Sequence, residues 1–172
     1  MSTRNLDALL SAMLISVSLT LAVGVPAAGA ATPEAQLLAP IRLLADSLNK
    51  GDMKTAASTM SSSGVTIIDE ISPHVWAGPD AFNTWLKALT AWEQAEAITD
   101  DVFKMGKPTS VVVGADRGYV ALPVSYTFKQ KGVAMREMAH MVYVLQKDKN
   151  AWLITAFTWV GGTPKPVAST AK

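Results

Sequence analysis

The most informative part of this sequence is the stretch from Gly64 to Phe82, GVTIIDEISPHVWAGPDAF. Its first part, Val65 to Glu70, is rich in β-branched residues and ends in two acids, which predicts a short strand. A loop with one histidine and one tryptophan follows, and Gly78-Pro79-Asp80 then begins a helix. A strand that ends in acids before such a loop places polar groups where we expect the mouth of a pocket.

The first thirty residues have the pattern of a secretory signal peptide. Arg4 lies in a short polar start, an uncharged apolar stretch runs from Ala8 to Val23, and Ala28-Gly29-Ala30 offers the small residues that a signal peptidase needs. The stretch is shorter than the ~20 apolar residues of a membrane-spanning helix. We therefore expect a periplasmic or secreted protein with no membrane attachment after cleavage over residues 1–30. An uncleaved N-terminal anchor is the alternative.

The composition of the chain fits a single exported domain. The 172 residues carry a net charge of +1, which gives no reason to expect a nucleic-acid partner. The chain has no cysteine, so a lipid anchor is excluded and the fold depends on its core without disulfides. Its 49% apolar residues and five tryptophans suffice for such a core. We expect one domain over residues 31–160 and a disordered tail over residues 161–172.

Helical signals lie on both sides of the opening strand. Thr32-Pro33 is a typical helix start, and Pro40 predicts that this helix is kinked or begins later. Gly51 is expected to end the helix, and Asp52 to cap a second, short one. The helix after the opening stretch carries an apolar stripe that should pack firmly: Phe82, Trp85, Leu86, Leu89 and Trp92.

The sequence changes to a strand pattern beyond Glu96. Turn signals rich in Gly, Pro, Asp and Lys separate five segments. The predicted strands are about Ile98–Lys104, Ser110–Ala115, Tyr119–Lys129, Val133–Gln146 and Ala151–Val160. Helices followed by a meander of long antiparallel strands predict an α+β fold, in which the helices gather on one face of a curved sheet.

Four features together resemble the NTF2-like superfamily, and in particular its SnoaL-like and ketosteroid-isomerase-like small domains. They are the Gly51-Asp52 turn, the VTIID strand, the HVWAGPDAF junction and the ending WLITAFTW. The resemblance implies a cone in which about three N-terminal helices pack on a curved, mostly antiparallel sheet, with a pocket between them. The superfamily includes isomerases, cyclases, dehydratases, hydrolases and proteins without known activity, so the fold does not fix a function.

Asp69 is the main candidate for a catalytic group. It shares a strand face with Val65 and Ile67, so it points inward if those two residues face the core. A carboxylate at the inward end of a strand can serve as a general base. The resemblance places Asp69 at the position of the ketosteroid isomerases' base, but Leu44 stands where that family has a tyrosine. The alternative is that Asp69 accepts hydrogen bonds from the following loop and shapes it.

The two histidines are further candidates. His74 lies in the loop before Trp76, either at the pocket mouth or simply on the surface. His140 lies within a predicted strand on the same face as Val142, and is either a satisfied core group or an acid/base group that acts with Asp69. Two histidines without an H-x-x-x-H pair do not support a metal site, and no phosphate-binding or nucleophile motif points to a cofactor.

Aromatic side chains are the other resource for binding. Rings in a half-open cone bind flat apolar ligands by stacking and by burial of apolar area. Trp92 and Trp152 are expected to lie in the core, where Trp85 also packs. Ala156 and Thr158 stand where related domains often carry a histidine, which makes the pocket more apolar. The expected ligand-binding residues are His74, Trp76, Trp85, Tyr126 and Trp159.

The segment from Tyr119 to Phe128 is apolar on both strand faces, which is typical of a sheet covered on both sides. One face covers the helices and the pocket, and a second copy of the chain is the simplest cover for the other.

Three functions remain open: an exported domain that binds a small, mostly apolar molecule, an isomerase- or cyclase-like enzyme with Asp69 as its base, and a non-catalytic dimerisation domain whose cone is filled.

Overall fold

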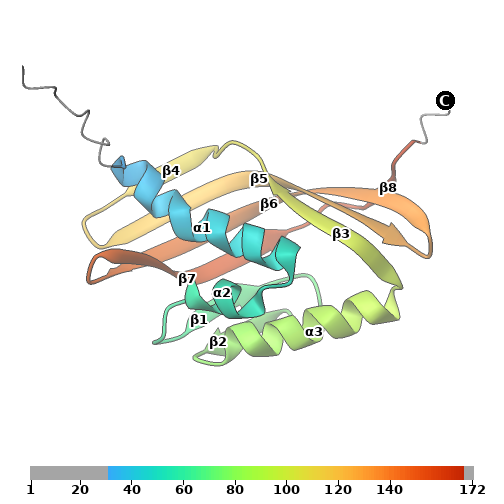
Figure 1. Cartoon of the computed structure of the whole chain (residues 1–172), viewed down its shortest axis with the longest axis horizontal. Helices are drawn as coiled ribbons and strands as arrows, with labels where there is room; N and C mark the ends of the chain where they lie inside the picture. Colours follow the sequence, from blue (N-terminus) through green and yellow to red (C-terminus); the bar gives the residue numbers. More distant parts are fainter. Residues whose placement is uncertain (1–30, 169–172) are drawn as a thin grey trace, which may run out of the picture. The chain divides into compact units, whose positions relative to one another are not determined.

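A computed structural model describes residues 31–168; the predicted signal peptide and residues 169–172 lie outside the described residues. Helices precede the long strands in this part of the chain (Figure 1), so the α+β prediction is confirmed. The elements are α1 (Pro33–Lys50), α2 (Met53–Ser58), β1 (Val65–Ile68), β2 (Val75–Gly78), α3 (Ala81–Ala95), β3 (Ile98–Met105), β4 (Ser110–Val113), β5 (Arg117–Gln130), β6 (Val133–Asp148), β7 (Ala151–Val160) and β8 (Lys165–Pro166).

Capping residues set the ends of the first two helices. The Thr32 side chain accepts a hydrogen bond from the Ala35 amide at 3.2 Å and begins α1. The helix continues through Pro40, so it begins before this proline, and Gly51 ends it with a φ of +70°. Asp52 then caps α2 through its side chain. The short connection turns α2 back against α1 and brings the chain to β1.

One mixed sheet forms the layer that faces the helices. Its strand order is β2-β1-β7-β6-β5-β3, and in addition β4 pairs with β5 and β8 pairs with β6. β1 and β7 run parallel, whereas β5 and β6 form an antiparallel ladder without a register shift from Arg117↔Gln146 to Gln130↔Val133. Figure 1 shows α1 lying across the long strands and α3 running beside β1 and β2.

Strand alternation divides the sheet into an inner and an outer face. Side chains on the inner face are buried against the helices, and those on the outer face are more exposed. No helix within residues 31–168 is both long and apolar enough to cross a membrane. The core joins inner-face residues to the helices: Val120, Leu122, Val124, Met141, Tyr143 and Leu145 pack with Leu37, Ile41, Leu44, Phe82 and Trp85.

Two short strands differ from the sequence prediction. Val75–Gly78, expected as loop and helix start, forms β2 and pairs with β1, and its Trp76 is buried in the core. The tail that was predicted to be disordered from residue 161 contains one short strand, because Lys165–Pro166 pairs with β6 as β8. β6 extends beyond the part that pairs with β7, so the edge of β6 near Met135 and Arg136 is free to pair with β8. The composition of the tail does not predict this strand, because the pairing depends on a distant segment.

Asn49, near the end of α1, fastens this helix to β3. Its side-chain amide donates a hydrogen bond to the Phe103 carbonyl at 2.8 Å, and its side-chain oxygen accepts one from the Phe103 amide at 2.9 Å. Both residues also line the cavity described below. The paired bonds therefore hold one side of the cavity together.

We expect Asn49→Ala to lower the free energy of unfolding by about 1–3 kcal/mol, because it removes two hydrogen bonds that contribute about 0.5–1.5 kcal/mol each. Urea unfolding followed by circular dichroism measures the change. Asn83→Ala is the control, because the Asn83 amide donates only to the exposed Asp80 side chain at the start of its own helix. An Asn49→Ala midpoint equal to that of the control would contradict the fastening role.

Candidate functional site

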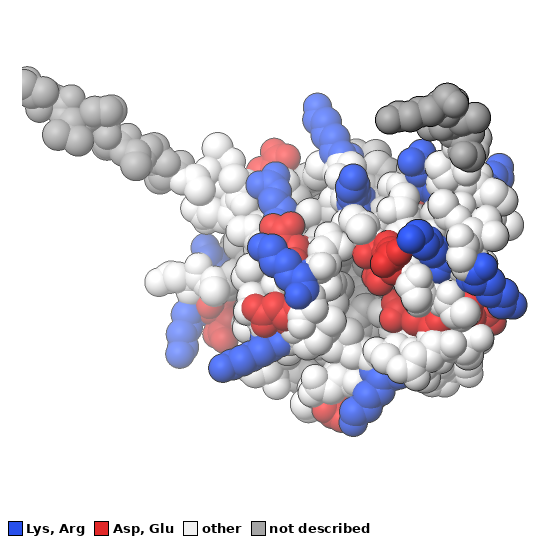
Figure 2. Space-filling model, turned by 45° about the vertical axis from the view of Figure 1, so that its right-hand side comes forward, with Lys and Arg blue, Asp and Glu red and all other residues white. Residues whose placement is uncertain are grey.

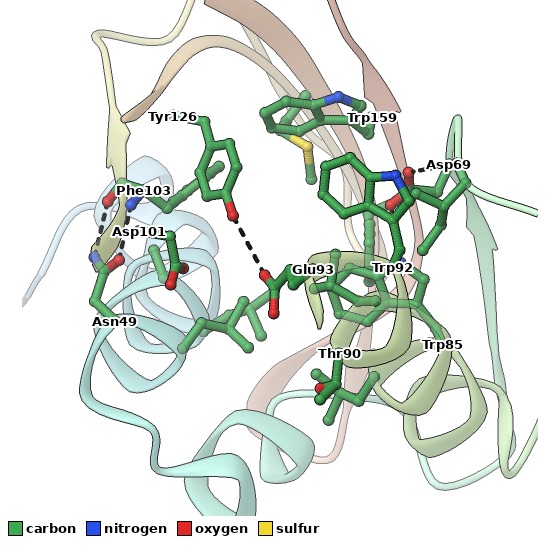
Figure 3. A pocket seen from close by; sticks show the side chains of 18 of the residues that line it. Asn49, Asp69, Trp85, Thr90, Trp92, Glu93, Asp101, Phe103, Tyr126 and Trp159 are labelled. Atoms are coloured by element: carbon green, nitrogen blue, oxygen red, sulfur yellow. Dashed lines mark hydrogen bonds between the residues drawn. The ribbon is translucent and has the colours of Figure 1, made fainter. Parts of the chain in front are cut away.

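A cavity of about 400 Å³ opens between the helices and the inner face of the sheet. Aliphatic residues of α1 and α3 form part of its wall, and acidic side chains come from α3, β3, β6 and the loop after β1. Within residues 31–168, no Lys, Arg or His side chain lines it. Its aromatic lining consists of Trp85, Trp92, Phe103, Tyr126, Tyr143, Phe157 and Trp159, of which Figure 3 labels all but Tyr143 and Phe157.

Glu137 is a carboxylic acid buried on the inner face of β6. Only 3% of its surface is exposed, and its Oε1 atom has no hydrogen-bond partner among the described residues. A Cβ atom added to Gly161 would contact this Oε1 atom and would lie 2.5 Å from both Glu70 Oε2 and Trp159 Nε1. The missing side chain at Gly161 therefore creates the space in which the Glu70–Glu137 pair meets the Trp159 indole.

The Glu70–Glu137 pair holds protons more tightly than ordinary carboxylic acids. Burial, together with the charge of Glu70, raises the pKa of Glu137 to about 7, and Asp69 adds to this rise. The Gly162 amide and the Trp159 indole act in the opposite direction. Burial and the charge of Asp69 also raise the pKa of Glu70. Glu137 is thus partly protonated at neutral pH and can donate or accept a proton.

A second polar group in the cavity consists of Glu93, Asp101 and Tyr126. The Tyr126 hydroxyl donates a hydrogen bond to Glu93 Oε1 at 3.3 Å, and Figure 3 shows Asp101 beside them. Burial and the charge of Asp101 raise the pKa of Glu93. Burial, followed by the charges of Asp101 and Glu93, raises the pKa of Tyr126. Tyr126 therefore remains a neutral hydrogen-bond donor.

Asp69 directly follows β1 and is half-buried at the cavity wall. Its Oδ2 accepts a hydrogen bond from Trp85 Nε1 at 2.9 Å, and its Oδ1 accepts one from the Ile71 amide at 3.3 Å. The first bond ties α3 to the end of β1, and the second shapes the loop between β1 and β2. Both of its oxygens are thus already engaged in holding the structure.

Sequence comparison gives no relative, since no protein-family profile and no curated protein matches this chain. Solved structures match its fold. A ketosteroid isomerase-like protein from Erwinia carotovora atroseptica has a TM-score of 0.58 at 16% identity, over 76% of this chain and 97% of its own. LinA, a hexachlorocyclohexane dehydrochlorinase, has a TM-score of 0.62 at 13% identity, over 78% of this chain and 91% of its own.

A third match supplies the name of the fold. An NTF2-like protein from Novosphingobium aromaticivorans has a TM-score of 0.59 at 10% identity, over 72% of this chain and 78% of its own. The chain has the NTF2-like fold. The resemblance inferred from the VTIID strand and the HVWAGPDAF junction is thereby confirmed at the level of the fold.

The cavity of this NTF2-like domain contains most of the site residues predicted from the sequence. His74 is exposed in the loop before β2, and Trp76 is buried in the core; neither lines the cavity. The predicted residues that line it are Asp69, Trp85, Tyr126 and Trp159.

His140 lies on the outer face of the sheet and is exposed. Its neighbours Ala139 and Met141 are buried on the inner face, so His140 points away from the cavity. His140 is therefore neither a core group nor a partner of Asp69 in the cavity, the two alternatives that the sequence left open. Both faces of β6 carry apolar residues. The sequence prediction placed the face that contains His140 toward the interior, whereas the structure places the face that contains Ala139 and Met141 there.

Glu137 and Glu93, two of the acids that line the cavity, were not among the site residues predicted from the sequence. Glu137 occupies the inward position two residues before Ala139 on an alternating strand, so strand period alone marks it as a buried acid once the correct face is chosen. Glu93 follows Trp85 and Leu89 at intervals of four residues, which places it on the stripe of α3 that faces the cavity. Strand alternation and helical spacing in the sequence therefore indicate that both acids point inward.

The raised pKa of Glu137 makes the stability of the NTF2-like domain depend on pH. The folded state binds the Glu137 proton more tightly than the unfolded state. The contribution of Glu137 to stability is therefore fully present below the usual pKa of 4.5 and is lost as pH rises to about 7. Over this range the ionisation of Glu137 should lower the free energy of unfolding by about 2–3 kcal/mol, and Glu137→Gln should abolish this decrease.

Thermal unfolding at pH 5 and pH 8 measures this dependence. Glu137→Gln should be more stable than the unmodified protein at pH 8 and closer to it at pH 5. Glu34→Gln, at an exposed position in the first turn of α1 outside the cavity, should keep the original dependence. A Glu137→Gln protein whose melting temperature falls with pH as steeply as that of the control would contradict the raised pKa.

Proposed function

We propose that this chain is an exported NTF2-like domain that binds a small, mostly apolar molecule in the cavity between its helices and its sheet. The observation that carries the proposal is the open, aromatic-lined cavity of about 400 Å³. Pockets of about 300–1,000 Å³ with apolar walls and a few polar groups are typical of small-molecule sites. Export rests on the signal-peptide pattern of residues 1–30 and places the domain in the periplasm or outside the cell.

The open cavity argues against the alternative of a dimerisation domain whose cone is filled by side chains. Trp76 is withdrawn into the core, and Trp85 and Trp159 stand at the cavity wall without closing it. Trp85 is held there by its bond to Asp69 and by an edge-to-face contact with Phe157, whose ring centre lies 5.3 Å away. These contacts support a wall that is already formed before a ligand arrives.

An isomerase- or cyclase-like enzyme is the second candidate function. The sequence favoured Asp69 as its base, but both Asp69 oxygens already accept hydrogen bonds. Glu137 fits proton transfer better, because its pKa of about 7 lies near neutral pH and its Oε1 atom has no partner in the described chain. A compound that the protein binds and returns unchanged would favour the binder; a compound returned as an isomer only while Glu137 is present would favour the enzyme.

We expect the protein purified from its native compartment to carry a non-covalent small molecule that native mass spectrometry detects. Leu89→Trp should abolish the adduct, because Leu89 lines the cavity and the larger ring fills it. Ala91→Trp, at an exposed position on the same helix outside the cavity, is the control and should keep the adduct. The protein mass should also correspond to a chain that begins near Ala31.

Two results would contradict the proposal. One is an unmodified protein without any adduct. The other is an adduct that Leu89→Trp retains as well as Ala91→Trp does, since the molecule would then lie outside the cavity.

We further propose that two copies of the domain pair through the outer face of the sheet. This face carries mostly uncharged side chains across β1, β7, β6 and β5, with Arg117, Lys129 and Arg136 toward the strand ends. Register places Ile68 beside Thr158, and Tyr119 beside Val144. A second copy would cover the apolar side chains that a single copy leaves exposed. They are Ile68, Val75, Val112, Tyr119, Met138 and Val160.

Light scattering at micromolar concentration tests the pairing. We expect a dimer, and we expect Met138→Lys to shift it to a monomer because a buried, unpaired charge at the interface is unfavourable. Leu43→Lys replaces a similarly exposed apolar residue on α1, away from the outer face, and should leave the dimer intact. A monomeric unmodified protein would contradict the proposal.

A further inference from the structure

The cavity collects negative groups without a positive one. Acidic side chains reach it from four separate segments of the chain, whereas no Lys, Arg or His within residues 31–168 lines it. Figure 2 shows one group of acidic side chains in the right-hand part of this face and others over its left-hand and lower parts, with basic side chains beside them. The acids that line the cavity are Asp69, Glu70, Glu93, Asp101 and Glu137.

Glu137 supplies a second, independent indication of a ligand. Buried polar atoms in folded proteins nearly always have a hydrogen-bond partner, and leaving one without a partner is unfavourable. Glu137 is 97% buried by its 3% exposure, and its Oε1 atom has no partner among the described residues. Because Glu137 lines the cavity, a donor carried by a ligand can reach the place where this partner is missing.

The aromatic rings near these acids fit the same kind of ligand. The Tyr126 and Trp159 rings lie 6.2 Å apart at 82°, and Phe103 lies 6.4 Å from Trp159. Rings that stand at an angle to one another around one space, here 82° for Tyr126–Trp159 and 46° for Phe103–Trp159, form the type of cage that binds ammonium groups through cation–π attraction. Carboxylates beside such a cage add charge attraction, and the aliphatic wall accommodates an apolar body.

A metal ion fits this arrangement less well. Among the described residues there is no group of three or more His, Cys, Asp or Glu side chains placed to hold one. The acids are instead distributed between the Glu70–Glu137 pair and the group around Glu93 and Asp101. An anionic ligand would meet repulsion from both groups. A larger organic molecule that carries its positive charge on an amine satisfies the charges, the rings and the shape together.

We propose that the cavity binds an organic cation, an amine or quaternary ammonium group attached to an aromatic or aliphatic body. This inference rests on the proposed binding function, because it names the class of ligand for the same cavity. The cation lies against Phe103, Tyr126 and Trp159, and its charge is balanced by the carboxylates on either side.

Binding of the cation is coupled to proton release. The groups that face Glu137 are Glu70 and Asp69 after β1 and Tyr126 on β5, while Glu93 and Asp101 line the same space from α3 and β3; none is basic. A bound positive charge favours the ionised form of Glu137. The affinity therefore rises as pH rises through about 7 and levels off above it.

Quenching of tryptophan fluorescence by three probes of similar shape tests the inference. The probes are benzyltrimethylammonium, its uncharged isostere neopentylbenzene, and phenylacetate. At pH 8 we expect benzyltrimethylammonium to bind about tenfold or more tightly than neopentylbenzene, and phenylacetate to bind most weakly. The affinity for benzyltrimethylammonium should increase between pH 6 and pH 8.

Charge-removing variants locate the effect. Glu137→Gln and, separately, Asp101→Asn should each weaken binding of benzyltrimethylammonium about three- to tenfold and leave that of neopentylbenzene unchanged. Asp101 is exposed, so its variant remains informative if Glu137→Gln alters the fold. Glu34→Gln, outside the cavity, should change neither affinity.

The outcomes distinguish failure of the cation inference from failure of the proposed binding function. Equal or tighter binding of neopentylbenzene or phenylacetate would overturn the cation inference while the binding function stands. A pH-independent affinity for benzyltrimethylammonium would also overturn it. Absence of binding by all three probes would overturn the binding function as well.

Discussion

The β5–β6 ladder determines which side chains the cavity receives. Its pairing runs from Arg117↔Gln146 to Gln130↔Val133 without a shift, so the alternation of inner and outer residues is fixed along both strands. Tyr126 and Glu137 are register partners within this ladder, and both face the cavity. A slip of one residue would put the outward residue Arg136 or Met138 in the place of Glu137. The acidic and aromatic character of the site thus depends on this single register.

The same ladder forces an unfavourable burial. Glu137 lies on the core side of β6, in line with Met141 and Tyr143, and its charge is opposed by Glu70 rather than balanced. Buried carboxylates of this kind reduce stability unless they hold a proton or meet a positive group. A large apolar core and the bond between Trp85 and Asp69 offset this cost. Strain of this kind tends to gather at functional sites, which is why it points to a ligand.

Strong local patterns made most of the fold predictable. They did not predict which acids point into the cavity. Capping at Thr32, Gly51 and Asp52 and the β-branched strand after Gly64 are short-range signals, and the structure follows them. β8 was missed because its stability comes from the free edge of β6, a distant segment. His140 was assigned inward and Glu137 overlooked because both faces of β6 are apolar, so periodicity separates the two sets without saying which set faces the helices.

The ionisation of Glu137 is the quantity on which the account depends most. Carbon-13 NMR of a protein labelled at its glutamate side-chain carboxyls, with the Glu137 signal assigned by its loss in Glu137→Gln, measures the titration of this group directly. We expect a midpoint at about pH 7 in the free protein, and a lower midpoint when benzyltrimethylammonium saturates the cavity. A midpoint near the usual value of 4.5 in the free protein would contradict it, because Glu137 would then be an ordinary solvated carboxylate.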